Sequence, residues 1–381
     1  MKILHINVAG IVDRFYSSMF NALNKLQNIK QEVYVPYKDG EYNEEDFKEL
    51  NKYDDSIQLT LRPIKNKSDR VLYNKKIKKY FKDIEENVDL SDFELIHAHS
   101  LLSDGGVAYK IKEMYGIPYI VAVRTTDTDI FLKYFIHLRK FAKNILENSD
   151  AIVFISPSIK NELLNRLDDI HVKKLVEKKS YIIPNGMNEF WLENKISKYE
   201  LSKSRIRLLQ VGRLIKSKNT DKSIYALRNL IDKGFDVELN IVGRGPELEN
   251  LKRITNKLNV KDRVIFHGFI NDKNILLKLY RKCDVFVLPS YSETFGIAYV
   301  EAMSQGLPII GVKESGIDGY FKDGYIGFFI DEAEGNEISE AVCKILSDYN
   351  RISLNCSSEC DRFDWNDIKE TYNYIYRKSI N

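Results

Sequence analysis

The sequence predicts an α/β protein of two domains, each with a parallel sheet between layers of helices. Short apolar runs alternate with amphipathic segments of helical length in both halves of the chain, which is typical of parallel sheets. A length of 381 residues is long for one core, and 44% hydrophobic residues are enough to fill two. A polar stretch that contains Asn-Gly, from Pro184 to about Ser204, fits neither the strand nor the helix periodicity. It predicts the linker between the two domains.

The expected strands are the short apolar runs, taken in chain order. In the first half they are 3–8, 31–36, 95–99, 119–123, 151–155 and 180–183. In the second half they are 207–211, 237–242, 264–267, 285–288, 308–312 and 327–330. A last helix is expected from Asp364 through Tyr376, because its apolar and aromatic residues recur at the spacing of one buried face. On the residues alone, this is the last helix of the second domain.

Charge and composition narrow the classes of function. Lys and Arg number 58 against 55 Asp and Glu, and a net charge of +3 argues against a dedicated nucleic-acid binder, which usually carries a large basic excess. The opening apolar run is too short for a signal peptide, and no run reaches the roughly 18 apolar residues of a membrane-spanning helix. We therefore expect a cytoplasmic protein with reduced, structural cysteines, which are Cys283, Cys343, Cys356 and Cys360.

The most informative feature is a pair of glutamates eight positions apart, Glu293 and Glu301. The residues at 284–290 read as a buried strand that ends in a turn, and those after Gly296 read as a helix. Ligands of parallel α/β sheets bind where strands end and helices begin, since free N–H groups and the helix dipole favour phosphate there. A carboxylate beside such a site can accept hydrogen bonds from two sugar hydroxyls. The pattern predicts a nucleotide sugar as the ligand.

Five segments follow one another in order. They are Ile-Pro-Asn-Gly at 183–186, Gln-Val-Gly-Arg-Leu at 210–214 with Lys-Asn at 218–219, the glycine turn at 241–246, Phe-His-Gly-Phe at 266–269 and the E-x7-E segment at 292–303. Taken together, they resemble the family 4 glycosyltransferases of the GT-B fold. The match extends from about Ser149 to the last residue. It implies two Rossmann-like domains facing each other across a cleft, with the final helix crossing back to the first. The expected domains are 1–185 with 365–381, for the acceptor, and 186–364, for the nucleotide sugar.

The resemblance assigns the donor residues. Gly212, Arg213 and Lys218 would hold the diphosphate, and the two cations would stabilise the charge that develops on it as the sugar departs. Glu301 would accept hydrogen bonds from the ribose, and Glu293 from the transferred sugar. The backbone amides of the next residues would lie near the sugar and phosphates; these residues are Thr294, Phe295, Gly296 and Ile297. The catalytic set is therefore Glu293, Arg213 and Lys218. The alternative is that the cations are solvated and that the glutamates complement a helix N-terminus.

A second glycine turn and a neighbouring strand complete the predicted donor site. Gly243 and Arg244 follow a strand, although such turns also serve packing, and Phe269 would contact the base through its backbone. No cofactor is expected besides the donor substrate, with a UDP-sugar favoured over a GDP-sugar. No metal is expected either, since cations and a helix end already supply positive charge. The D-x-D at 127–129 is discounted because it lies in the wrong half of the chain.

The acceptor side departs from the family pattern. Where many members have two adjacent glycines after the first strand, this chain has Gly10 alone, and Arg124 replaces the histidine of a His-Gly-x-Asp motif whose aspartate is Asp127. An arginine cannot act as a base, so we expect it to hold an anionic group of the acceptor. His99 ends a strand and is a candidate for lining the acceptor cleft; with His97 it could also suggest a metal, but no carboxylate partner is evident.

The resemblance implies a retaining transfer to a glycan or lipid-linked glycan acceptor, such as a capsule or O-antigen. Front-face attack, in which the departing phosphate takes the acceptor proton, is the expected mechanism. A nucleotide-sugar epimerase on the same fold and a non-catalytic nucleotide-binding subunit stay open as alternatives.

A basic segment at 62–82 carries nine Lys or Arg and one acid, Asp69. The apolar residues Tyr73, Ile77, Tyr80 and Phe81 fall at helical spacing in the same stretch. One interpretation is a surface helix with a solvated basic face. The other is docking to the anionic inner face of the cell membrane, where a lipid-linked acceptor would lie.

Overall fold

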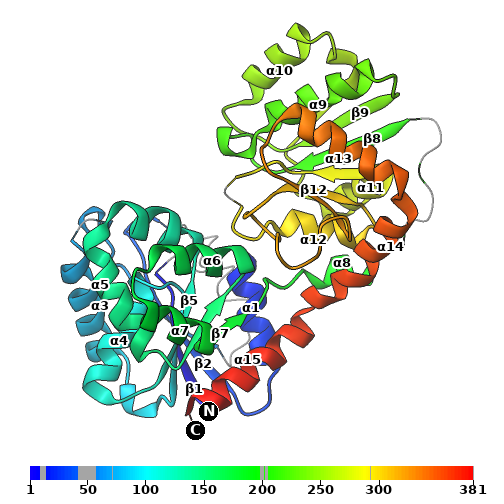
Figure 1. Cartoon of the computed structure of the whole chain (residues 1–381). Helices are drawn as coiled ribbons and strands as arrows, with labels where there is room; N and C mark the ends of the chain where they lie inside the picture. Colours follow the sequence, from blue (N-terminus) through cyan, green and yellow to red (C-terminus); the bar gives the residue numbers. More distant parts are fainter. Residues whose placement is uncertain are drawn as a thin grey trace. The chain divides into compact units, whose positions relative to one another are not determined.

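The structure is a computed structural model, and it describes residues 1–8, 14–41, 57–70, 72–197, 201, 205–291 and 293–380. The chain folds into two compact units (Figure 1). The N-terminal unit comprises Met1–Ile155, Ile159–Gly186 and Trp365–Asn381, and the C-terminal unit comprises Ser156–Ser158 and Met187–Asp364. Apart from the brief excursion at Ser156–Ser158, the chain leaves the N-terminal unit after Gly186, builds the rest of the C-terminal unit, and returns at Trp365.

The N-terminal unit is a parallel seven-stranded sheet with the order β3-β2-β1-β4-β5-β6-β7. Its strands are β1 (Lys2–Ile6), β2 (Lys30–Pro36), β3 (Ile57–Arg62), β4 (Leu95–Ala98), β5 (Tyr119–Val123), β6 (Ala151–Phe154) and β7 (Ser180–Ile182). Its described helices are α1 (Arg14–Asn24), α3 (Tyr73–Asn87), α4 (Ser103–Tyr115), α5 (Arg139–Asn148), α6 (Pro157–Arg166), α7 (Ile170–Lys179) and α15 (Trp365–Ile380).

The C-terminal unit is a parallel six-stranded sheet with the order β10-β9-β8-β11-β12-β13. Its strands are β8 (Ile206–Val211), β9 (Val237–Val242), β10 (Val264–Gly268), β11 (Val285–Val287), β12 (Ile309–Val312) and β13 (Gly327–Ile330). Its described helices are α8 (Glu189–Glu193), α9 (Thr220–Asp232), α10 (Leu248–Lys257), α11 (Lys273–Lys282), α12 (Ile297–Ser304), α13 (Gly335–Ser347) and α14 (Tyr349–Glu359). In both sheets the strand order reverses next to the first strand, and such sheets bind ligands at the carboxyl ends of those strands.

The final helix α15 packs on the N-terminal unit, which confirms the crossover (Figure 1). Its buried residues are Trp365, Ile368, Tyr372, Ile375 and Tyr376, the face that the helical spacing predicts. They join one hydrophobic cluster with residues of α1, β1, β4 and β5. The Tyr376 hydroxyl also lies 2.9 Å from His97 Nδ1, so a polar contact fixes the helix on the sheet.

The predicted α/β architecture with two parallel sheets is confirmed, and each expected strand overlaps an observed one. One strand was not predicted, the edge strand β3. Its sequence, Ile-Gln-Leu-Thr-Leu-Arg, alternates apolar and polar residues because only part of an edge strand is covered, whereas the prediction relied on continuous apolar runs. The expected linker also contains the short helix α8. None of the helices in the described ranges is long and apolar enough to span a bilayer.

Candidate functional site

The carboxyl ends of β8 and β11 bring two predicted donor segments together. These strands are neighbours in the sheet, so the turn after β8 and the turn after β11 meet. The Asn219 side-chain amide donates to the Pro289 carbonyl oxygen at 2.7 Å, and the Ser290 hydroxyl donates to the Ser217 carbonyl oxygen at 3.1 Å. Asn219 adopts a φ of 48°, which turns the chain sharply into α9. The two turns therefore form one fixed surface at the switch point of the sheet.

Lys218 and Glu293 lie in contact on this surface. The Lys218 ammonium group donates to the Glu293 carboxylate, and the exposed fractions of the two side chains are only 17% and 16%. Arg213 is exposed, and within the described part of the chain no acid pairs with it. Lys218 and Glu293, which the sequence assigned to the diphosphate and to the sugar of the ligand, are thus adjacent. Arg213, the third predicted catalytic residue, directs its cation to solvent.

Glycine permits the close approach of three turns. Gly243 has a φ of 147°, and a Cβ there would lie 1.8 Å from the Gly212 carbonyl oxygen. Its N–H donates to the Gly268 carbonyl oxygen at 2.8 Å, so the turn after β9 lies between those after β8 and β10. The Arg244 guanidinium lies 4.8 Å from the centroid of the Phe269 ring, which is exposed. The predicted residues Arg244 and Phe269 are therefore a stacked pair at this edge.

The N-terminus of α12 supplies backbone donors. Gly296 precedes the helix with a φ of 77°, and a Cβ there would lie 2.5 Å from the Tyr299 ring. No described residue accepts a hydrogen bond from the N–H groups of 294–297. The Phe295 side chain is buried against Phe363, with ring centroids 5.6 Å apart, so its amide is the part available to a ligand. This arrangement can receive an anionic group.

Glu301 lies half-buried on α12, and Tyr280 orients it. The Tyr280 hydroxyl donates to Glu301 Oε2 at 3.2 Å. Burial, followed by the nearby Glu301 charge, raises the pKa of Tyr280 well above its usual value, so the tyrosine stays protonated and remains a donor. The sequence argument missed Tyr280, because it precedes Glu301 by 21 positions on another helix.

Ser315 also escaped the sequence argument. Its hydroxyl accepts from the Glu293 N–H at 2.9 Å and donates to the Ser290 carbonyl oxygen at 2.9 Å. The Gly316 N–H donates to the Glu293 carbonyl oxygen at 2.7 Å. The loop after β12 thus fixes the backbone of Glu293 from both sides. In the sequence, the one sign of this role is the Ser315-Gly316 pair shortly after the predicted strand at 308–312.

The predicted acceptor residues lie at the carboxyl edge of the N-terminal sheet, except Gly10, which is outside the described residues. Asp127 is buried and accepts from the backbone N–H groups of Arg124, Leu101 and Leu102 at 3.0, 3.0 and 3.2 Å. Arg124 is half-buried, and its Nε donates to the His99 carbonyl oxygen at 3.0 Å. Asp127 thus holds the loop that carries Arg124, and contact of either residue with an acceptor stays a prediction.

His99 belongs to a buried cluster of three imidazoles that the sequence argument did not assemble. His5 and His97 are opposite each other on β1 and β4, and His5 Nδ1 lies 3.0 Å from His99 Nε2. Burial lowers the pKa of His5 to about 3 and lowers those of the other two well below the usual value, so all three are neutral near pH 7. In the described chain this is the one group spaced for a metal, with ligand atoms within 4.8 Å of one another. Stacked rings fill it, with His97 and His99 centroids 4.1 Å apart.

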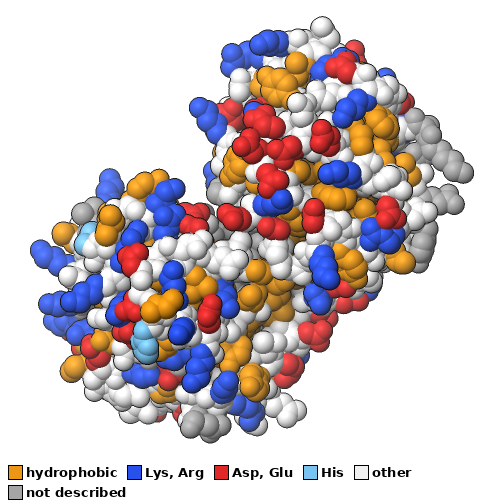
Figure 2. Space-filling view, viewed as in Figure 1, with side chains coloured by type: hydrophobic (Ala, Val, Ile, Leu, Met, Phe, Trp, Pro, Cys, Tyr) orange, Lys and Arg blue, Asp and Glu red, His pale blue; other side chains and the backbone are white. Residues whose placement is uncertain are grey.

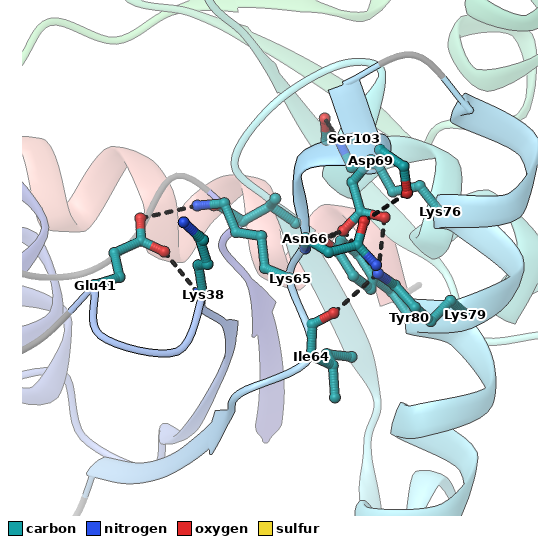
Figure 3. Close-up of polar contacts among 12 residues, drawn as sticks. Lys38, Glu41, Ile64, Lys65, Asn66, Asp69, Lys76, Lys79, Tyr80 and Ser103 are labelled. Carbon is teal, nitrogen blue, oxygen red and sulfur yellow. Dashed lines mark hydrogen bonds and ion pairs between the residues drawn. The ribbon is translucent and has the colours of Figure 1, made fainter.

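Four of the nine basic residues in the segment at 62–82 pair with acids. The ion pairs, with N–O distances, are Arg62 with Asp83 (2.9 Å), Lys65 with Glu41 (3.1 Å), Lys79 with Asp69 (2.7 Å) and Lys82 with Glu86 (3.5 Å). Figure 3 shows two of these pairs, together with Lys76, whose buried ammonium group donates to Ser103 Oγ at 2.6 Å. Most of the partner acids lie outside the segment, which is why its sequence overstated its free charge.

Two family models match consecutive parts of the chain. The model described as Glycosyltransferase Family 4 matches residues 15–189, and the model described as Glycosyl transferases group 1 matches residues 192–359. Together they span both units. An uncharacterized glycosyltransferase of Methanocaldococcus jannaschii, MJ1178, is 27% identical over 260 residues, which cover 68% of this chain and 67% of that protein.

A second relative and a solved structure extend the comparison. The N-acetyl-alpha-D-glucosaminyl L-malate synthase of Bacillus anthracis is 25% identical over 263 residues, covering 68% of this chain and 66% of that protein. The crystal structure of Anabaena HepE in complex with UDP has a TM-score of 0.72 and 17% identity, covering 98% of this chain and 99% of the other. This structural likeness concerns the fold alone.

Proposed function

Because the chain belongs to the family 4 glycosyltransferases of the GT-B fold, we propose that it transfers a hexosyl group from a nucleoside diphosphate sugar to a hydroxyl group of a glycan or lipid-linked glycan acceptor. The observation that supports this most is the contact between Lys218 and Glu293 beside the N-terminus of α12. A diphosphate favours a cation and free N–H groups, and a sugar favours a carboxylate that accepts from its hydroxyls. A nucleoside diphosphate sugar carries both a diphosphate and sugar hydroxyls.

We assign the roles from the charges and positions of the side chains. Lys218 and Arg213 bind the diphosphate and stabilise its growing negative charge as the glycosidic bond breaks. Glu293 accepts hydrogen bonds from hydroxyls of the transferred sugar, and Glu301, oriented by Tyr280, accepts from the ribose. Arg244 and Phe269 flank the nucleoside. Binding of the complete donor therefore replaces the Lys218–Glu293 contact, because each partner acquires its own part of the ligand.

We propose a mechanism that retains the anomeric configuration, as the resemblance to family 4 implies. The acceptor hydroxyl approaches on the face from which the diphosphate leaves, its oxygen bonds to the anomeric carbon, and its proton passes to the departing phosphate oxygen. The protein then contributes positioning and charge stabilisation. On the acceptor side we propose Arg124 as the residue that holds an anionic group, on a loop that Asp127 fixes.

The donor is tested first by thermal shift with matched UDP-, GDP- and ADP-hexoses, since a ligand that binds the native protein raises its Tm. We expect a UDP-sugar to give the largest shift, in line with the UDP that HepE binds. NMR of the donor with and without an acceptor then identifies the reaction. Conversion of the donor alone would indicate an epimerase, and binding without turnover would indicate a nucleotide-binding subunit.

A further inference from the structure

We propose that the contact between Lys218 and Glu293 makes the proposed donor site select a nucleotide that still carries its sugar over the spent nucleoside diphosphate. The inference rests on the proposed function for the identity of these two ligands. It goes further because it gives the contact a role after the transfer, in the release of the product. Its physical basis is the burial of the pair and the rigidity of the loop that carries Glu293.

The contact neutralises two charged groups that are withdrawn from water. The Lys218 ammonium group donates to the Glu293 carboxylate, and both side chains are largely buried. In the described part of the chain no other cation pairs with this carboxylate. Removing one partner of such a pair leaves a desolvated charge uncompensated, which is strongly unfavourable. A ligand that attracts Lys218 therefore has to supply a new partner for Glu293 or leave that carboxylate uncompensated.

Glu293 is held in place and cannot follow the lysine. Its N–H donates to Ser315 Oγ at 2.9 Å, and its carbonyl oxygen accepts from the Gly316 N–H at 2.7 Å. Two glycines also lie against its side chain, since a Cβ at Gly296 would be 2.8 Å from Glu293 Cγ and a Cβ at Gly316 would be 3.5 Å from Glu293 Cβ. The four-carbon stem of Lys218 is flexible by comparison. When a diphosphate binds, the ammonium group moves and the carboxylate stays.

The sugar-linked nucleotide and the spent nucleotide differ in two respects at this carboxylate. Hydroxyls of the sugar donate to Glu293 once Lys218 has turned to the diphosphate, whereas the spent nucleotide has no such hydroxyls. The terminal phosphate of the spent nucleotide loses a second proton at about pH 6, so near neutral pH it carries about one more negative charge. At a site with cations alone, this charge would favour the spent nucleotide. A fixed carboxylate repels it, so Glu293 reverses the preference that Lys218 and Arg213 would have by themselves.

Acids on the surface beside the site act in the same direction. Figure 2 shows Asp and Glu side chains gathered in one area of the C-terminal unit, next to α9 and α13. The Tyr291 hydroxyl accepts from the Ala333 N–H at 2.8 Å, so the loop that precedes α13 adjoins the turn that carries Glu293. This loop has three exposed acids, of which the first and the last pair with lysines; the acids are Asp331, Glu332 and Glu334. They add negative potential that favours release of the more highly charged ligand.

The contact opens and closes once in each turnover. Binding of the complete donor separates Lys218 from Glu293 and gives each its own part of the ligand. After the sugar has passed to the acceptor, Glu293 faces a ligand that offers it no hydroxyl, so the contact forms again as the nucleoside diphosphate dissociates. One unsatisfied, largely buried group weakens binding by about tenfold or more, and we expect the unmodified chain to prefer the donor over the spent nucleotide by at least that factor.

Calorimetric titration of the full chain with UDP-glucose, UDP and inorganic pyrophosphate tests the proposal. Glu293→Gln keeps the shape of the side chain and removes its charge, so it should bind UDP and pyrophosphate about tenfold more tightly than the unmodified chain does. Its affinity for UDP-glucose should not rise, and the preference for the sugar-linked nucleotide should disappear. Unchanged or weaker binding of pyrophosphate by this variant would overturn the proposal.

Two controls separate the pair from the charge of its surroundings. Glu314→Gln removes the same charge from an exposed acid on the neighbouring loop after β12, and it should leave all three affinities unchanged. In a Lys218→Met background there is no pair to separate, so Glu293→Gln should tighten pyrophosphate binding by less than about threefold. Equal effects of Glu293→Gln in both backgrounds would show repulsion by a single charge and would overturn the role of the pair.

Pyrophosphate carries neither base nor sugar, so the pair is tested independently of the proposed function. Tighter pyrophosphate binding by Glu293→Gln, with no binding of UDP-, GDP- or ADP-hexoses, would support the pair and contradict the proposed donor. Donor binding with unchanged pyrophosphate affinity in Glu293→Gln would support the donor and contradict the pair. Absence of pyrophosphate binding to both the unmodified chain and the variant would also overturn the inference.

Discussion

The carboxyl edges of the two sheets are built in opposite ways. In the C-terminal unit, short loops with glycine and serine present cations, a carboxylate and backbone amides at a fixed surface. In the N-terminal unit, the same edge contains buried titratable groups that come from distant parts of the chain. Burial lowers the pKa of Lys76 to about 8 and raises that of Asp104 to about 7. Local loops therefore specify the proposed donor site, and tertiary packing specifies the edge where we propose that the acceptor binds.

The largest expected effect is a selective loss of stability of the N-terminal unit in acid. The unfolded chain protonates its histidines near pH 6.5, whereas buried His5 does so near pH 3, so its stabilising contribution falls with pH across that window. Burial lowers the pKa values of His97 and His99 in the same direction, whereas it raises those of Asp104 and Asp127, and these two carboxyl groups oppose the imidazoles. Because three imidazoles outnumber two carboxyl groups, we expect the unfolding free energy of this unit to fall on the order of 1 kcal/mol per pH unit as the pH drops below about 6.5.

Urea titrations at successive pH values check this loss. The chain has two tryptophans, Trp191 in the C-terminal unit and Trp365 in the N-terminal unit, so Trp191→Phe and Trp365→Phe give one fluorescent reporter for each unit. The C-terminal unit contains a single histidine, His267, and serves as the internal control. An equal loss of stability in acid in both units would contradict the difference between them.

The next effect concerns the close-packed turns of the C-terminal unit. Gly243→Ala would place a Cβ 1.8 Å from the Gly212 carbonyl oxygen at a positive φ, so we expect the unfolding free energy of this unit to fall by about 2–4 kcal/mol. Gly212→Ala is the matched control, because a Cβ there meets nothing within 4 Å. Denaturant unfolding, followed by Trp191, measures both. Equal stability of the two variants would remove the steric argument.

A charge change at Lys218 tests whether the loops hold a diphosphate. Lys218→Met should weaken binding of the nucleoside diphosphate identified by thermal shift by about tenfold to a hundredfold, since a charge-assisted hydrogen bond is lost. Lys216→Met, an exposed cation two positions earlier in the same turn, should leave the Kd nearly unchanged. Calorimetric titration supplies both constants, and similar losses for the two would show that only the net charge of the loop matters.

The smallest effect tests the orientation of Glu301. Tyr280→Phe removes the hydroxyl that donates to its carboxylate at 3.2 Å, and we expect roughly fivefold weaker nucleoside diphosphate binding. Tyr299→Phe, which removes a hydroxyl donating to the Leu288 carbonyl oxygen at 2.7 Å, serves as a control for stability. An unchanged Kd in the Tyr280→Phe variant would show that the tyrosine hydroxyl does not position Glu301 for binding.

The sequence predicted best those features whose determinants are local. The buried strands were recognised as apolar runs, and the buried face of α15 was recognised from the helical spacing of its apolar residues. Glu293 and Glu301 fall in one continuous motif. Edge strand β3 was missed because its partial exposure dilutes the apolar signal. The sequence interpretation of the basic segment overstated its free charge, since the compensating acids, such as Glu41 and Asp83, lie outside it.

Features that depend on distant residues could not be read in the same way. Tyr280 reaches Glu301 from another helix, and Ser315 reaches Glu293 from the loop after the next strand. The three imidazoles come together only because β1 and β4 pair, although their residues are separated by about ninety positions. A single sequence carries no sign of such pairings, because each residue is unremarkable in its own neighbourhood.

The return of the chain at residue 365 sets an order of assembly. The C-terminal unit is continuous from 187 to 364 and can complete its core while the protein is still being synthesised. The N-terminal unit has to wait for Trp365 and Tyr376 to leave the ribosome before its sheet is covered. Until then an aliphatic strand surface stays open to chaperones, and a chain that stops translation before α15 would yield one finished unit attached to an unfinished one.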